Sequence, residues 1–143
     1  MWGSGINQPF PVTNLYPPIM AGDQDWRQYY TVNLLNLPHH YHNGGVWPFI
    51  GGFYVAALIK TKQFVKAKKE LNFLEKTNFN EWLDGKTGKI KGTPYQGWSA
   101  GTYIFASECL RLKKVLFFCR HNKKNKYLEK VLVVDNIVLF QLN

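Results

Sequence analysis

The sequence predicts a mainly α-helical protein whose helices form part of a helical toroid, with a short β-hairpin near the C-terminus. Two strongly apolar segments, residues 48–61 and 99–112, are separated by an amphipathic segment at 63–77. One amphipathic helix cannot cover the whole surface of an apolar neighbour, so this alternation indicates further helices around it, as in a toroid. Apolar residues make up 45% of the 143-residue chain and aromatic residues 16%, which excludes a disordered chain.

Residues 1–45 are expected to form an ordered loop ahead of the first helix. They are rich in Pro, Gly, Asn and Tyr and show no sustained hydrophobic period. One turn of helix is expected at "DQDWRQYY", with Asp23 as its cap. A connection of this length in a compact domain is usually functional or is built around something that is missing.

Each predicted helix has its own sequence pattern. Pro48 suits a first helical turn, and the nearly continuous apolar surface that follows predicts a fully buried inner helix. The second helix carries lysines on most of its surface and is predicted to lie outside, because apolar residues recur only on one face: Phe64, Ala67, Leu71 and Leu74. The third helix is again apolar, and Ser99 is its expected N-cap.

The C-terminal stretch differs in character from the helical part. "KVLVVDNIVLF" consists of two β-branched runs split by Asp-Asn, which predicts a hairpin with that dipeptide as its turn. We therefore divide the chain into residues 1–118, the helical portion, and residues 119–143, a divergent tail.

The net charge of +9 is carried almost wholly by the second half of the chain. Such asymmetry can indicate nucleic acid or an anionic surface as partner. In residues 60–91, however, the basic groups are all lysines on helix and loop positions opposite the apolar ones, whereas phosphate recognition usually prefers arginine. Solvation of the outer faces is the better interpretation there, and nucleic acid is not expected as a partner.

Cysteine use and hydropathy bear on the compartment. Cys109 and Cys119 are the only cysteines and have no framework spacing, which favours reduced thiols and a cytoplasmic location. The N-terminus shows no basic and apolar regions of a signal peptide. The apolar run at 46–59 is too short to span a bilayer, so no membrane association is expected.

Two polar and aromatic loops, "HHYHNGG" and "NEWLDG…YQGWS", each precede an apolar helix. In a helical toroid such loops converge on one face, so their side chains are expected to meet there. Amides and carboxylates beside flat aromatic faces suit a carbohydrate ligand. The candidates are Glu81 as catalytic acid or base and, as substrate-binding residues with Trp82 beside them, His42, Asn43, Trp47, Asp84, Gln96 and Trp98.

Plainer interpretations stand beside these assignments. Trp47 and Trp98 can equally serve as core aromatics, and Glu81 taken alone can be an ordinary loop carboxylate. The histidine cluster could ligate a metal, but no cysteine or carboxylate stands at ligand spacing. We therefore expect no metal and no cofactor, and a structural role for His39 and His40.

The order of three motifs carries a family resemblance. "YHNGGVWP" before an apolar helix, then "NEWLDGKTGK", then "YQGWSAGTYIFASECL" resemble the C-terminal part of the catalytic domain in inverting (α/α)6-barrel glycosidases. The similarity is to the amylo-α-1,6-glucosidase (glycogen-debranching) type and to the neutral/alkaline invertase type. It covers approximately residues 15–112.

The resemblance implies a fold and assigns the general base and the general acid. The chain would form part of an (α/α)6 toroid, with Glu81 as the general base of an inverting hydrolysis of an α-glucoside, an α-glucan or sucrose. The general acid would be an upstream Asp that has no match in this chain. An N-terminal barrel half, or self-association, is then the expected partner besides the carbohydrate. The alternatives are a non-catalytic sugar-binding or structural remnant and, less favoured, a basic nucleic-acid-binding module.

Overall fold

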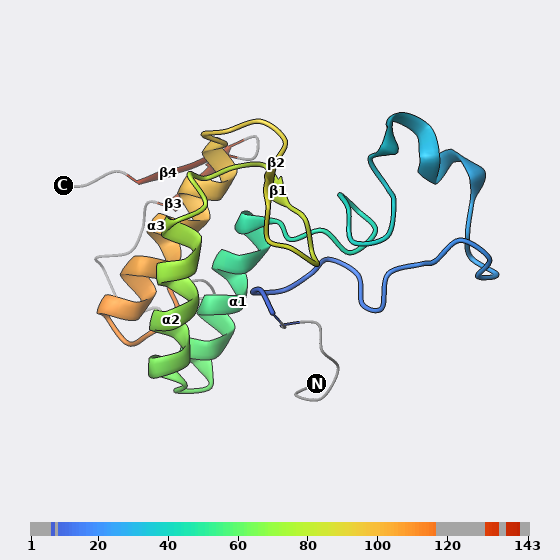
Figure 1. Cartoon of the computed structure of the whole chain (residues 1–143). Helices are drawn as coiled ribbons and strands as arrows, with labels where there is room; N and C mark the ends of the chain where they lie inside the picture. The colour runs from blue at the N-terminus through green and yellow to red at the C-terminus, as the bar shows by residue number, and fades with distance from the viewer. Residues whose placement is uncertain (1–6, 8, 117–130, 135–136, 141–143) are drawn as a thin grey trace.

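A computed structural model describes residue 7 and residues 9–116, 131–134 and 137–140 (Figure 1). A short 3-10 helix, η1, comes first, and three α-helices and two antiparallel strand pairs follow. The elements are η1 (Gln28–Leu34), α1 (Pro48–Lys60), α2 (Phe64–Glu75), β1 (Trp82–Leu83), β2 (Ile90–Lys91), α3 (Gly97–Arg111), β3 (Val131–Val134) and β4 (Ile137–Phe140). The prediction of a mainly α-helical chain is confirmed.

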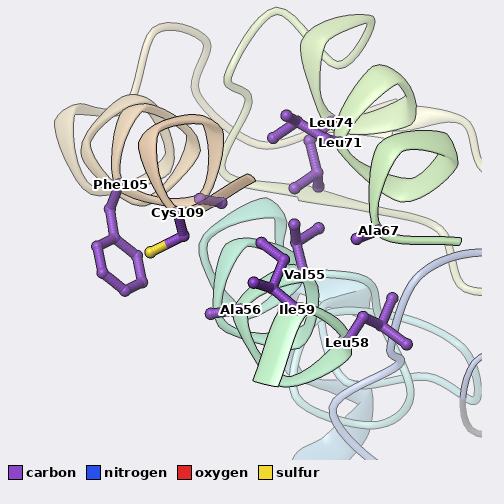
Figure 2. Close-up of a cluster of buried hydrophobic side chains, with 10 residues drawn as sticks. Val55, Ala56, Leu58, Ile59, Ala67, Leu71, Leu74, Phe105 and Cys109 are labelled. Carbon is purple, nitrogen blue, oxygen red and sulfur yellow. The ribbon is translucent and has the colours of Figure 1, made fainter. Parts of the chain in front are cut away.

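The core lies where the three α-helices meet, and α1 packs against both of the others (Figure 2). α1 and α2 form a helical hairpin because the chain reverses over residues 61–63, where Lys62 has a φ of +60° and Gln63 N donates to Leu58 O at 2.8 Å. The buried side chains of the core are Val55, Ala56, Leu58, Ile59, Ala67, Leu71, Leu74, Phe105, Ala106 and Cys109. Burial raises the pKa of the Cys109 thiol, so this cysteine packs as a small apolar residue.

Two adjacent glycines let α1 approach both neighbouring helices. A Cβ added at Gly51 would lie 2.6 Å from Leu74 Cδ2 of α2. A Cβ at Gly52 would lie 2.7 Å from Thr102 Cβ and 2.8 Å from Thr102 O of α3. The Gly52 contact is the more restrictive, because a backbone atom cannot rotate away as a leucine methyl can.

The helix predictions need three corrections. α1 is not buried on all sides, since Phe53 is 45% exposed and Ala57 is exposed as well. α3 begins at Gly97, so Ser99 is not its N-cap. Ser99 is buried in the first turn instead and donates its hydroxyl to Asn80 O at 3.3 Å. α2 is shorter than predicted at both ends.

The N-terminal segment runs away from the helices and returns to α1 (Figure 1). It contains η1, none of whose residues is buried. Asp23 does not cap this helix, because Arg27 occupies the N-cap position. The Asp23 Oδ2 instead accepts from Met20 N at 2.7 Å and closes a preceding turn. The sequence predicts one helical turn at residues 23–30, whereas η1 spans Gln28–Leu34.

Both strand pairs are antiparallel. β3 and β4 pair with Val134 opposite Ile137, which confirms the C-terminal hairpin, whereas its Asp-Asn turn and the predicted boundary at 118/119 lie outside the described residues. β1 and β2 form a two-residue pair inside what was predicted as loop. Within the described part of the chain, no helix has the length and apolar character to cross a membrane.

The packing of α1 against α3 predicts opposite effects for alanine at two helical glycines. Gly52→Ala is expected to lower the free energy of unfolding by about 1–3 kcal/mol, because the added methyl overpacks against Thr102. Gly101→Ala, which has nothing within 4 Å of its added Cβ, should raise it by about 0.5–1 kcal/mol through helix propensity. Urea unfolding followed by circular dichroism measures both, and equal shifts of the same sign would contradict this packing.

Candidate functional site

The two predicted loops meet through main-chain hydrogen bonds. Val46 N donates to Leu83 O at 2.9 Å, and Leu83 N donates back to Val46 O at 2.8 Å. A third bond joins Gly85 N to His39 O at 2.8 Å. The expected convergence is confirmed, and it places Glu81 of the second loop beside the residues that precede α1.

Asn43 holds the first loop in shape. Its Oδ1 accepts from Ile19 N at 2.7 Å, and its Nδ2 donates to Ile19 O at 2.9 Å and to Asn36 O at 3.1 Å. The side chain is buried, so these main-chain groups use most of its hydrogen-bonding capacity. The amide thus ties the loop to two earlier parts of the chain.

The glycine pair that follows is required by geometry. Gly44 has a φ of +94°, in the left-handed region that favours glycine. Gly45 lies so close to an earlier residue of its own loop that an added Cβ would stand 2.5 Å from Tyr41 O. Glycine at both positions lets the loop fold back onto Tyr41.

Both carboxylate oxygens of Glu81 accept a hydrogen bond. The Tyr41 hydroxyl donates to Oε1 at 3.2 Å, and Thr93 N donates to Oε2 at 3.2 Å. The main chain is fixed as well, since Glu81 N donates to Thr93 O at 2.9 Å. The Glu81 side chain is half-buried, so the carboxylate is fixed in place while part of it stays accessible to solvent.

Aromatic rings surround Tyr41. The ring centroids of Trp47 and Trp82 lie 4.9 and 5.8 Å from that of Tyr41. The His42 ring is exposed and stacks on Trp47 at 5.1 Å with an interplanar angle of 1°. Burial raises the pKa of the Tyr41 hydroxyl, and the charge of Glu81 and its hydrogen bond raise that pKa further.

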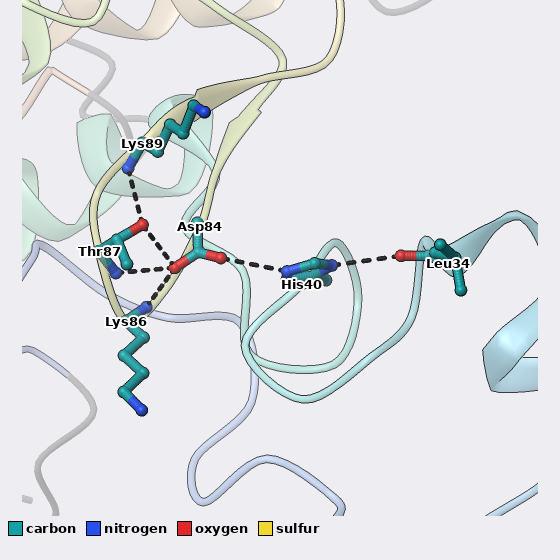
Figure 3. Close-up of polar contacts among 6 residues, drawn as sticks. All are labelled: Leu34, His40, Asp84, Lys86, Thr87 and Lys89. Carbon is teal, nitrogen blue, oxygen red and sulfur yellow. Dashed lines mark hydrogen bonds and ion pairs between the residues drawn. The ribbon is translucent and has the colours of Figure 1, made fainter.

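Asp84 is the centre of a separate polar cluster (Figure 3). Its Oδ1 accepts from Lys86 N at 3.0 Å, Thr87 N at 2.7 Å and Thr87 Oγ1 at 2.8 Å. Its Oδ2 lies 3.1 Å from His40 Nε2, and His40 Nδ1 lies 3.2 Å from Leu34 O at the end of η1. The carboxylate therefore closes its own turn and connects it, through His40, to the N-terminal segment.

The environment of Asp84 favours its ionised form. Burial by itself would raise the pKa of Asp84, but the hydrogen bonds from Thr87 and Lys86 and the charge of His40 outweigh burial and lower it. The expected structural role of His40 agrees with this arrangement. Among the described residues, no group of three or more His, Cys, Asp or Glu side chains could hold a metal ion.

Gln96 and Trp98 lie at the start of α3. Gln96 Nε2 donates to Thr93 O at 3.4 Å, next to the amide that binds Glu81. Trp98 is 52% exposed. Trp47 is instead buried and donates Nε1 to Tyr41 O at 3.1 Å.

Sequence reasoning missed two residues of this site. Tyr41 stands inside the quoted "HHYHNGG" motif, and its hydroxyl could have been counted as a donor for the nearby carboxylate. Thr93 acts through its main-chain N–H, which no side-chain pattern reveals.

The site is thus a half-buried loop carboxylate, Glu81, beside the aromatic ring of Tyr41 and ahead of packed helices. Residues 5–112 match the model of the alkaline and neutral invertase family. That match covers well over half of the sequence, and the chain belongs to this family.

Individual relatives agree with the family match. Over 107 residues the chain is 32% identical to probable alkaline/neutral invertase D of Arabidopsis thaliana, covering 70% of this chain and 20% of the relative. It is also 32% identical over 107 residues to cytosolic invertase 1 of Oryza sativa subsp. japonica, a match that covers 70% of this chain and 19% of that relative. Alkaline/neutral invertase CINV1 of Arabidopsis thaliana is 32% identical over 116 residues, with 76% and 20% covered. The chain thus spans about a fifth of the length of these relatives.

The Asp84 cluster predicts a pH-dependent contribution to stability. Asp84→Ala is expected to lower the free energy of unfolding at neutral pH by about 1–3 kcal/mol, because the donors of Lys86 and Thr87 lose a charged acceptor. The pKa of Asp84 is lowered by folding, so its contribution is present above the unfolded-state pKa and is lost as pH falls through the folded-state value.

Urea unfolding from about pH 7 to about pH 2 tests this, since the range spans the ordinary titration of aspartate. The difference in the free energy of unfolding between wild type and Asp84→Ala should become smaller toward about pH 2. Asp25→Ala, at an exposed acid of the N-terminal segment, is the control and should change little. A gap that stays constant with pH would contradict the assigned role of the ionised carboxylate.

Proposed function

We propose that this chain supplies the water-activating part of a glycoside hydrolase active site, with Glu81 as general base and sucrose or a related α-glucoside as substrate. The observation that carries the proposal is the Glu81 carboxylate, anchored from two sides by Tyr41 and Thr93. A carboxylate held in one orientation is suited to take a proton from water, and positioned acid–base catalysis typically contributes about 10²–10⁴-fold to the rate.

The proposed chemistry is hydrolysis with inversion at the anomeric carbon. Glu81 would remove a proton from water while a carboxylic acid protonates the leaving oxygen, and such carboxyl groups stand about 6.5–9.5 Å apart. Asp84 is a poor candidate for that acid, because Lys86, Thr87 and His40 contact both of its oxygens. We infer that the acid is an Asp supplied by the upstream part of the catalytic domain.

The predicted sugar-binding residues divide by exposure. His42, Gln96 and Trp98 offer an exposed ring, a half-buried amide and an exposed indole, so we assign them direct contacts with the carbohydrate. The buried Asn43 and Trp47, together with Asp84, bind the protein's own main chain. We assign these three to holding the site in shape around the sugar.

Family membership favours sucrose over an α-1,6-glucan, because the matching relatives are named invertases. The glycogen-debranching type of activity has no comparable support.

A non-catalytic, sugar-binding or structural role is the second candidate, and its support is the chain's coverage of only about a fifth of its relatives. The lysines of α2 lie mostly on its exposed side, which supports solvation over nucleic-acid binding.

The remaining barrel is the proposed protein partner, with self-association as the alternative outcome. Phe53 of α1 and Ile104 of α3 are 45% and 57% exposed, and large exposed apolar side chains on helices are suited to bury against further helices.

We propose a cytoplasmic location from cysteine use. Relatives named cytosolic, mitochondrial and chloroplastic all match the chain, so the family by itself does not fix the compartment.

Complementation tests the proposed function. The chain is co-expressed with, or fused to, the upstream part of an invertase-family catalytic domain, and glucose release is measured from sucrose, trehalose and α-1,6-glucan. Glu81→Gln keeps the side-chain shape but accepts a proton poorly, so it should reduce hydrolysis by about 10²–10⁴-fold. Glu75→Gln, at an exposed carboxylate of α2, is the matched control and should retain the wild-type rate.

Two results would overturn the assignment. One is a Glu81→Gln complex that hydrolyses its best substrate as fast as wild type. The other is first-formed glucose of the same anomeric configuration as the substrate, detected by NMR, because a base-activated water must attack the opposite face of the sugar.

A further inference from the structure

We propose that Tyr41 is a positioning residue for Glu81: its hydroxyl fixes the orientation of the carboxylate that the proposed function makes the general base. The kinetic consequence rests on that proposed function, whereas the contact itself does not. Tyr41 therefore acts through another side chain and is not assigned to touch the substrate.

The geometry of the carboxylate supports this role. One donor, the Tyr41 hydroxyl, comes from the loop before α1, and the other, Thr93 N, comes from the loop before α3. A carboxylate that accepts a hydrogen bond at each oxygen cannot change its χ1 or χ2 rotamer, or rotate about its terminal bond, without losing one of them. Each oxygen keeps a further lone pair, so Glu81 can still accept a hydrogen bond from water.

The main chain of Tyr41 is held in a conformation that only a dense set of contacts maintains. Its φ is +36°, which is unusual for a bulky residue. Its carbonyl accepts from Asn14 Nδ2 at 2.9 Å, Trp47 Nε1 at 3.1 Å and Gly45 N at 3.1 Å. Strained residues persist where the surroundings over-determine them, and they cluster at functional sites.

The side chain of Tyr41 is restrained as tightly. Trp47 and Trp82 pack against its ring, and the His42 ring centroid lies 4.2 Å from its own. The pKa of the hydroxyl is raised by burial and by Glu81, so the phenol stays protonated at neutral pH and remains a donor. A residue that only filled space would not need this hydroxyl, and phenylalanine would pack equally well.

The first test removes the hydroxyl and keeps the ring. In the complemented enzyme, Tyr41→Phe should lower kcat by about 10- to 100-fold while KM stays within about twofold, because small misplacements of a catalytic group cost rate more than ground-state binding. Tyr54→Phe is the matched control: its hydroxyl also takes part in one hydrogen bond, from Asn7 Nδ2 at 2.9 Å, but lies outside the site. That variant should keep wild-type kcat and KM.

The second test needs no activity. In the full 143-residue chain, side-chain scalar couplings measured by NMR should report one dominant Glu81 rotamer in the wild type and in Tyr54→Phe, and rotamer averaging in Tyr41→Phe. This readout is independent of hydrolysis. An inactive wild-type complex would therefore contradict the proposed function but would not decide whether Tyr41 orients Glu81.

Three results would overturn the positioning role. Unchanged Glu81 couplings in Tyr41→Phe would show that the hydroxyl does not orient the carboxylate. An unchanged kcat in an active complex would show that any orientation is irrelevant to the rate. An increase in KM alone would assign Tyr41 to direct contact with the sugar.

Discussion

The reciprocal main-chain pairing of Val46 with Leu83 is the contact on which the site depends. Val46 lies two residues before α1 begins, and Leu83 lies two residues after Glu81. Both side chains are buried, at 0% and 2% exposure, so water does not compete for the two hydrogen bonds. The pairing therefore fixes the position of the carboxylate relative to the helical core.

Other features of the site follow from this pairing. With Leu83 fixed, Asp84 reaches His40 and orders its own turn, and His40 in turn contacts the carbonyl of Leu34 (Figure 3). The Gly44–Gly45 pair lets the first loop turn back over Tyr41, whose hydroxyl then reaches Glu81. The polar cluster before α1 is thus mainly a scaffold, and His42 is its exposed ring.

The helices and the meeting of the two loops could be predicted from the sequence because they follow from periodicity and from motif order. The start of α3 could not, since Gln96 and Gly97 are weak helix-start residues and the favourable cap Ser99 lies inside the first turn. The exposure of Phe53 could not be predicted either, since α1 is apolar nearly all round and its sequence does not mark one side as exposed. The Thr93 contact with Glu81 uses main-chain atoms that every residue possesses, so residue type carries no information about it.

Native-state hydrogen exchange of the Val46 and Leu83 amides tests the central claim most directly. If the two loops open as one unit, both amides should exchange with the same opening free energy. Gly45→Ala, which crowds Tyr41, should lower that free energy for both amides together. A protected Leu83 amide beside a Val46 amide that exchanges at the rate of an unstructured peptide would contradict the account.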